Sequence, residues 1–121
     1  RWTSTPSGFC GLLARASDDL HALHLGLPGR DILAAGIPWY GAVFGRDAIL
    51  TAFETLAHNP EIARETLRFL AEYQGRKVDP FTEEEPGKIL HELRRGEMAR
   101  NREIPHLPYY GTVDATPLWI I

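Results

Sequence analysis

A two-residue link between two helical patterns, Asn59–Pro60, constrains the fold of this chain more than any other sequence feature. Before it, residues 47–58 leave few polar positions, so this helix is expected to be buried on nearly all sides. After it, the asparagine cap and the proline predict a second helix that runs to Gln74 and ends at Gly75. Helices joined so briefly must pack antiparallel, which is the repeat unit of an α/α barrel or solenoid. An all-α fold is therefore predicted.

The rest of the chain is expected to contain a long helix, a marginal helix and loops. Apolar residues recur at three- and four-residue steps and predict an amphipathic helix over Ser7–Leu25. Residues 89–100 have few apolar positions and contain Gly96, so they predict only a helical turn or two. Thr116–Pro117 repeats the cap-plus-proline signal and predicts the start of a last helix. The remaining segments are predicted to be a strand or extended loop at 31–35, a polar loop at 76–86 and irregular chain at 104–111.

Composition and charge narrow the class of partner. With 44% hydrophobic and 24% charged residues among 121, the chain has the balance of a folded domain. A net charge of −3 with scattered Lys and Arg gives no basic surface, so nucleic acid is not an expected partner. Neither a bilayer-spanning run of about 20 apolar residues nor a signal-peptide core is present, so no membrane partner is expected. The single cysteine, Cys10, fits a reducing compartment, and the cytoplasm is the expected location.

Residues suited to chemistry gather in three loops. The loops are residues 38–47, 85–92 and 105–114. In the first, Arg46 and Asp47 lie at the start of the predicted buried helix, beside Trp39 and Tyr40. Either Asp47 caps the helix and Arg46 pairs locally, or the two charges bind vicinal sugar hydroxyls while the rings cover the C–H face of the sugar.

The second loop offers Lys88, His91 and Glu92, which one helical turn would bring near one face. His91 and Glu92 are adjacent rather than four residues apart, and the chain has one cysteine, so neither a metal nor another cofactor is expected. A solvated face with local ion pairs is the alternative for these three residues.

The third loop ends at Asp114, next to the predicted last helix and after Tyr109, Tyr110 and Gly111. An acid among aromatic rings can have its pKa raised by desolvation, as a general acid needs at neutral pH. A carboxylate at a helix start can instead serve as an N-cap, and the helix dipole lowers its pKa. The sequence leaves both interpretations open.

These loops also resemble the signature blocks of a known enzyme family. The resembling segments are residues 35–40 with 44–49, residues 85–92 and residues 108–119. Together, in this order, they are similar to bacterial glycogen-debranching-type amylo-α-1,6-glucosidases, which are (α/α)6-barrel glycoside hydrolases. The wider set of similar enzymes includes glucoamylases, mannosylglycerate hydrolase-like proteins and alkaline/neutral invertases. The resemblance extends from about Gly8 to the end of the chain.

The resemblance implies an inverting glycosidase that hydrolyses α-glucosidic linkages, such as the α-1,6 branches of glycogen-like glucans. Asp114 would protonate the leaving oxygen, while Arg46 and Asp47 would hold the non-reducing-end sugar of an oligosaccharide or polysaccharide. The same pocket would be lined by Trp39, Lys88, His91, Glu92 and Tyr110. Inverting chemistry needs a second carboxylate about 6.5–9.5 Å from the acid. In similar enzymes this base lies far downstream, so the chain alone is expected to be inactive.

The ends of the sequence suggest a partial domain. The chain has no initiator methionine and stops within the apolar run 118–121. Residues 1–121 are therefore expected to be a single partial domain, the N-terminal part of the catalytic barrel. The remainder of the barrel, or self-association, would cover its exposed helix faces. The alternatives are a non-catalytic helical-hairpin binding module and a barrel hydrolase acting on trehalose, mannosylglycerate or sucrose.

Overall fold

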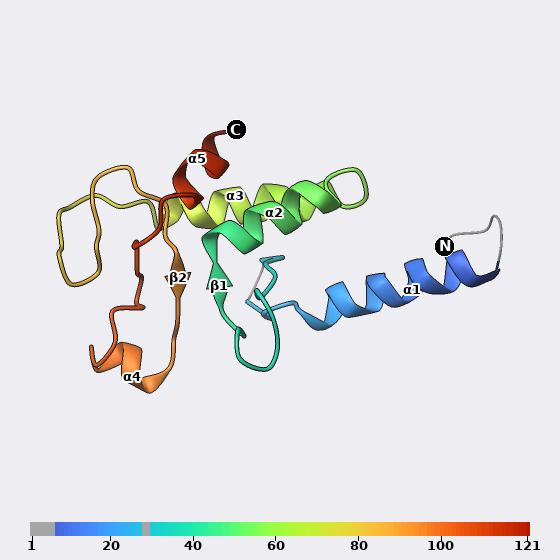
Figure 1. Cartoon of the computed structure of the whole chain (residues 1–121), viewed down its shortest axis with the longest axis horizontal. Helices are drawn as coiled ribbons and strands as arrows, with labels where there is room; N and C mark the ends of the chain where they lie inside the picture. The colour runs from blue at the N-terminus through green and yellow to red at the C-terminus, as the bar shows by residue number, and fades with distance from the viewer. Residues whose placement is uncertain (1–6, 28–29) are drawn as a thin grey trace.

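The computed structural model describes residues 7–27 and 30–121, and this part of the chain is mainly helical (Figure 1). The helices are α1 (Ser7–Ala22), α2 (Gly45–Thr55), α3 (Pro60–Glu72), α4 (Glu97–Arg100) and α5 (Ala115–Ile120). One antiparallel pair of short strands joins them, β1 (Val43–Phe44) and β2 (Glu92–Leu93). The predominance of helix agrees with the predicted class, whereas the strand pair was not predicted.

The helical hairpin of α2 and α3 forms the centre of the molecule (Figure 1). The side chain of Asn59 accepts a hydrogen bond from the backbone N–H of Glu61 at 3.2 Å, and Pro60 begins α3. The predicted cap is therefore confirmed. The helix ends at Glu72, two residues before the predicted end at Gln74.

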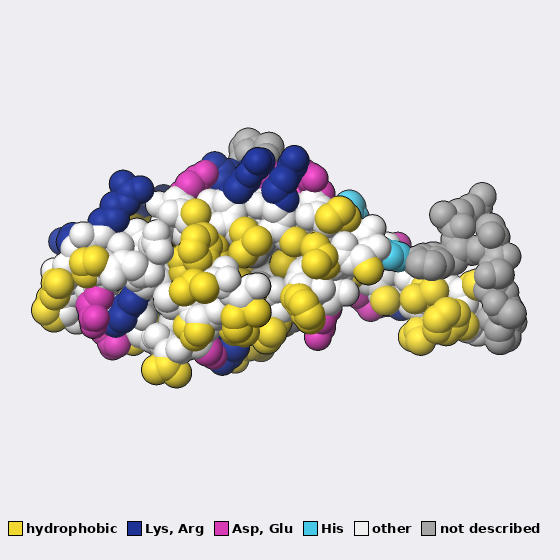
Figure 2. All heavy atoms as spheres, turned by 90° about the horizontal axis from the view of Figure 1, so that it is seen from above, with side chains coloured by type: hydrophobic (Ala, Val, Ile, Leu, Met, Phe, Trp, Pro, Cys, Tyr) yellow, Lys and Arg dark blue, Asp and Glu magenta, His cyan; other side chains and the backbone are white. Residues whose placement is uncertain are grey.

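The prediction that α2 is buried on nearly all sides is wrong. Ala48, Ile49 and Ala52 are buried, whereas the Phe53 side chain is 74% exposed and Leu50 is also exposed. The reason is that α3 packs against only one side of α2 (Figure 1). Figure 2 shows hydrophobic side chains exposed over the central part of the molecule, as expected of a helix with one covered face.

Helix α1 extends away from the other helices (Figure 1). It ends at Ala22, three residues before the predicted end, and apolar residues such as Phe9 and Leu12 are exposed. After α1, Leu25 lies beside Ile32, and its N–H donates to the carbonyl of Ile32 at 3.0 Å. Residues 31–35 are thus an extended loop, one of the two predicted forms, with one bridge between residues 24 and 33.

The strand pair connects the three loops that the sequence marked, residues 38–47, 85–92 and 105–114. Val43 pairs with Leu93 and Phe44 with Glu92, and Glu92 also pairs with Tyr109. Residues 92–93 are therefore strand, and only Glu97–Arg100 of the predicted segment is helix. The main core lies between the hairpin and this sheet. Its buried residues are Ile32, Val43, Ile49, Phe69, Leu70, Ile89, Leu90, Leu93, Tyr110 and Ala115.

Helix α5 starts two residues earlier than the Thr116–Pro117 signal suggested. Its N-cap position is Asp114, and Thr116 lies inside the first turn. The hydroxyl of Thr116 accepts a hydrogen bond from the N–H of Ile89 at 2.9 Å. Thr116 therefore ties α5 to the loop before β2 instead of capping the helix.

Candidate functional site

Close backbone contact at Gly45 brings the beginnings of α2 and α5 together. The N–H of Gly45 donates to the carbonyl of His91 at 2.9 Å. A Cβ atom on Gly45 would lie 2.1 Å from the carbonyl oxygen of Leu90 and 3.2 Å from the Cβ of Ala115. Only glycine permits this approach, which places the first turn of α2 next to the residue that precedes α5.

Arg46 links two carboxylates at this junction. Its Nη1 donates to Oδ2 of Asp114 at 3.1 Å, and its Nε lies 3.6 Å from Oδ2 of Asp47. Asp47 is in the first turn of α2, where the N-cap position belongs to Phe44, so Asp47 is not the cap residue. The Oδ2 atom of Asp47 is inaccessible to solvent and accepts no hydrogen bond from the described residues. The cluster thus contains an acceptor oxygen whose hydrogen-bonding capacity is unused.

Asp114 is held from both sides. The Thr112 hydroxyl donates to Oδ1, and Arg46 occupies Oδ2. Although Asp114 occupies the N-cap position of α5, its side chain makes no capping hydrogen bond. The hydrogen bond from Thr112, with the Arg46 guanidinium, holds the pKa of Asp114 below its ordinary value, against the opposing effect of desolvation. The Asp114 carboxyl is therefore ionised at neutral pH, because desolvation does not outweigh the two groups that lower its pKa.

A row of aromatic rings passes beside this cluster. His91, whose carbonyl binds the start of α2, lies edge-on to Phe44 at 5.6 Å and to Tyr109 at 6.0 Å between ring centroids. Tyr40 extends the row beyond Phe44, and His106 extends it beyond Tyr109. The Nδ1 atom of His91 is buried and has no hydrogen-bond partner among the described residues. These rings offer edges and faces to a ligand bound at the cluster.

Of the other predicted site residues, Trp39 is exposed in the loop before β1. The side chains of three more, Tyr110, Lys88 and Glu92, bind other parts of the chain. The Tyr110 hydroxyl is buried and donates to the carbonyl of Tyr73 at 2.7 Å. Lys88 binds the carbonyl oxygen of Glu83 and the carboxylate of Glu85 within its own loop.

Glu92 is buried in an ion-pair network. It accepts a hydrogen bond from Arg94, and its Oε2 lies 3.4 Å from Nδ1 of His106. The structure therefore brings Arg46, Asp47 and Asp114 together, and the backbone carbonyl of His91 bonds to Gly45, the residue before Arg46. The contacts of Lys88, Glu92 and Tyr110 serve the loops and the core.

Two residues of the site were not identified from the sequence. Thr112 binds Asp114, and its position two residues before an aspartate is typical of such local hydroxyl contacts. Tyr109 donates its hydroxyl to Oε1 of Glu83 at 2.8 Å, and this bond raises the pKa of Tyr109. A Cβ on Gly111 would lie 2.0 Å from the Tyr109 hydroxyl, so the glycine leaves room for that ring.

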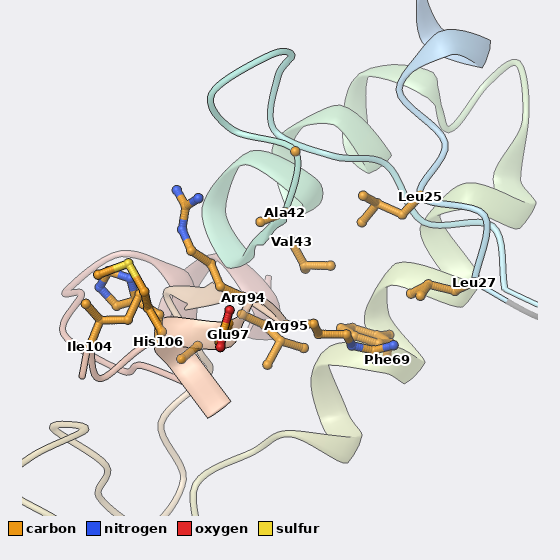
Figure 3. Close-up of a pocket in the computed structure, with 15 residues that line it drawn as sticks. Leu25, Leu27, Ala42, Val43, Phe69, Arg94, Arg95, Glu97, Ile104 and His106 are labelled. Carbon is orange, nitrogen blue, oxygen red and sulfur yellow. The ribbon is translucent and has the colours of Figure 1, made fainter. Parts of the chain in front are cut away.

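The main cavity, about 660 Å³, lies away from the cluster, between the strand pair, α3 and the segment around α4 (Figure 3). Arg46, Asp47 and Asp114 do not line it. Its floor includes Val43 and Phe69, which are already buried in the core. Its lining is mostly apolar and also includes Arg94, Arg95, Glu97 and His106, whereas the residues predicted for chemistry lie in the cluster around Arg46.

Comparison with family models and with curated proteins found no match to this chain. Within residues 7–27 and 30–121, no helix has the length and apolar character needed to cross a membrane. The same residues contain no group of three His, Cys, Asp or Glu side chains arranged to hold a metal ion.

Proposed function

We propose that this chain is part of an (α/α)6-barrel glycoside hydrolase that cleaves α-glucosidic linkages, in particular the α-1,6 branches of glycogen-like glucans. The observation that supports it most is the convergence of Arg46, Asp47 and Asp114 on one point. Arg46 and Asp114 are 68 positions apart in the sequence, yet their side chains bond at the start of two neighbouring helices. Active sites of barrel enzymes are built from loops at one end of the barrel elements, and the meeting of two helix starts at this cluster supports the proposal.

In this proposal, Arg46 and Asp47 bind the sugar. The side chains of Arg46 and Asp47 are both partly exposed, so Arg46 can donate to hydroxyl oxygens and the Asp47 carboxylate can accept from hydroxyl groups. Vicinal hydroxyls both donate and accept, so they match this pair. The ring row around His91 would lie against the less polar side of the sugar.

Asp114 is the proposed general acid. Protonated, its carboxyl would donate to the glycosidic oxygen as the bond to the anomeric carbon breaks. Water would then attack from the opposite face, activated by a second carboxylate about 6.5–9.5 Å away. We assign that base to residues outside the present sequence, so this role calls for the larger protein.

Hydrolysis of a branched dextrin by the protein that carries this chain tests the proposal. Asp114→Asn keeps the size of the side chain but removes the acid, and turnover should fall about 10²- to 10⁴-fold. Asp18→Asn, on the exposed surface of α1, is the matched control and should leave turnover unchanged. Equal turnover in the two variants, with helix content intact, would exclude Asp114 as the acid.

A non-catalytic sugar- or protein-binding module is the second candidate, and the ionised state of Asp114 favours it. Such a module would bind isomaltose without hydrolysing it in any context. Within the hydrolase proposal, trehalose, mannosylglycerate and sucrose are alternative substrates, and a substrate panel separates them. Specificity for a branched dextrin over these three would support the glucan assignment.

A further inference from the structure

Both carboxyl oxygens of Asp114 accept hydrogen bonds from neighbouring side chains. Thr112 binds Oδ1 from the same loop, and Arg46 binds Oδ2 from α2 at 3.1 Å. A general acid has to carry a proton on the oxygen that faces the leaving group. Here Oδ2 faces a guanidinium, which has only donors and favours the ionised carboxylate.

Within residues 7–27 and 30–121, few charged groups are placed to influence this carboxyl. From α2 they are Arg46 and, through it, Asp47. From the polar loop 76–86, Glu83 reaches the neighbourhood of Gly111, but its Oε1 is held by the hydroxyl of Tyr109. The Thr112 hydrogen bond and the Arg46 guanidinium both lower the pKa of Asp114, and Arg46 is the charged group of the two. Its side chain is 46% exposed, so a ligand can reach it.

Two carboxylates, those of Asp114 and Asp47, lie near the guanidinium of Arg46. Asp114 takes Nη1, while Nε lies 3.6 Å from Oδ2 of Asp47, too far for a hydrogen bond. A sugar hydroxyl that reaches the exposed part of the Asp47 carboxylate, which is 37% exposed, could donate to that carboxylate and accept from Arg46. That hydroxyl would compete with Asp114 for the guanidinium.

We propose that Arg46 is a positioning residue that occupies Oδ2 of Asp114, and that a bound sugar hydroxyl draws Arg46 away, so that Oδ2 takes up a proton more readily. Thr112 stays bound to Oδ1 and fixes the orientation of the carboxyl group. The proton comes from solvent water. It passes from Oδ2 to the glycosidic oxygen as the carbon–oxygen bond breaks, which returns Asp114 to the carboxylate. This inference rests on the proposed function and adds control of its acid by the substrate.

Carbon-13 NMR of the Asp114 carboxyl, followed through a pH titration of the whole chain, tests the exchange. Without sugar, Arg46→Gln should raise the titration midpoint of Asp114 because it removes the positive charge. Saturating isomaltose should raise the midpoint in the unaltered chain and leave it unchanged in Arg46→Gln. Thr112→Val should raise the midpoint without sugar yet keep the further rise on adding isomaltose, and Thr112→Ser should restore the original midpoint.

The possible failures are distinguishable. If isomaltose shifts the signals of Asp47 and Arg46 but the midpoint of Asp114 stays constant, the exchange is wrong and the sugar site stands. If Arg46→Gln has no effect on the midpoint without sugar, the exchange is also wrong. If isomaltose causes no change in any signal of the cluster, the proposed function and the exchange both fail.

Discussion

The guanidinium of Arg46 lies 3.1 Å from the carboxylate of Asp114, although 68 positions separate the two residues. Arg46 belongs to the first turn of α2, and Asp114 immediately precedes α5. The ion pair therefore depends on how these two helices meet. Gly45 and Ala115, which touch at that point, set the distance between the helix starts.

Replacing Gly45 by alanine should disrupt this junction. The new Cβ would lie 2.1 Å from the carbonyl oxygen of Leu90, and backbone cannot move aside as a flexible side chain can. Overpacking of this kind costs about 1–3 kcal/mol, so the urea midpoint should fall. Gly41→Ala is the control, because no atom lies within 4 Å of a Cβ placed there. Equal midpoints for the two variants would contradict the close approach.

The N-cap of α3 offers a second stability test. Asn59→Ala removes the oxygen that accepts from the N–H of Glu61 and should cost about 1 kcal/mol in the free energy of unfolding. Asn59→Asp keeps an acceptor oxygen at the same position and should retain most of the stability. Urea denaturation of both variants compares them, and an alanine variant as stable as the aspartate variant would refute the role of the cap.

The uncovered side of α2 should promote self-association. Leu50, Phe53 and Leu56 are exposed on it, and Phe53 is the most exposed of the three. Phe53→Ser should reduce association without loss of helix content, because the residue is outside the core. Sedimentation velocity at several concentrations measures the effect. Phe81→Ser, in the polar loop, is the control and should not change it. If the Phe53 variant associates as strongly as the unaltered chain, the exposed side of α2 is not the surface of self-association.

Tyr110 should make the fold sensitive to alkaline pH. Burial raises the pKa of Tyr110 to about 12, above the value of about 10 for a free tyrosine. Because the folded-state pKa is the higher one, its contribution to stability is complete below about pH 10 and is lost as the pH rises toward 12. The loss is on the order of 2 kcal/mol.

Two tyrosine-to-phenylalanine variants test whether ionisation of Tyr110 causes the loss of stability at alkaline pH. Tyr110→Phe should flatten the fall in unfolding free energy between about pH 10 and 12, at the cost of the hydrogen bond to the Tyr73 carbonyl. Tyr40→Phe, at an exposed ring, should leave the fall as it is. Identical pH profiles for the two variants would mean that the Tyr110 phenol ionises freely in the folded chain.

Local signals in the sequence predicted the local structure well. Asn59–Pro60 gave the start of α3 because a cap is decided by adjacent residues. The strand at Glu92–Leu93 was missed because it exists only through pairing with Val43–Phe44, about 50 positions away. The one-sided burial of α2 was missed because apolar periodicity does not specify how many neighbours a helix has.

The site was predictable only in part, because some of its contacts are local in sequence and others join distant segments. Arg46, Asp47 and Asp114 were marked by their aromatic and glycine-rich surroundings, and the fold brings them together. Lys88 shared such surroundings, yet its ammonium is held by its own loop. The state of Asp114 depends on Thr112 and on a guanidinium from another helix, which no local pattern contains.

A crystal structure of the protein with bound isomaltose tests the central claim most directly. The account predicts that one glucose ring contacts both Arg46 and Asp47, with Asp114 within hydrogen-bonding distance of the glycosidic oxygen. Isomaltose bound elsewhere, with Arg46 still paired to Asp114 as in the ligand-free chain, would contradict it.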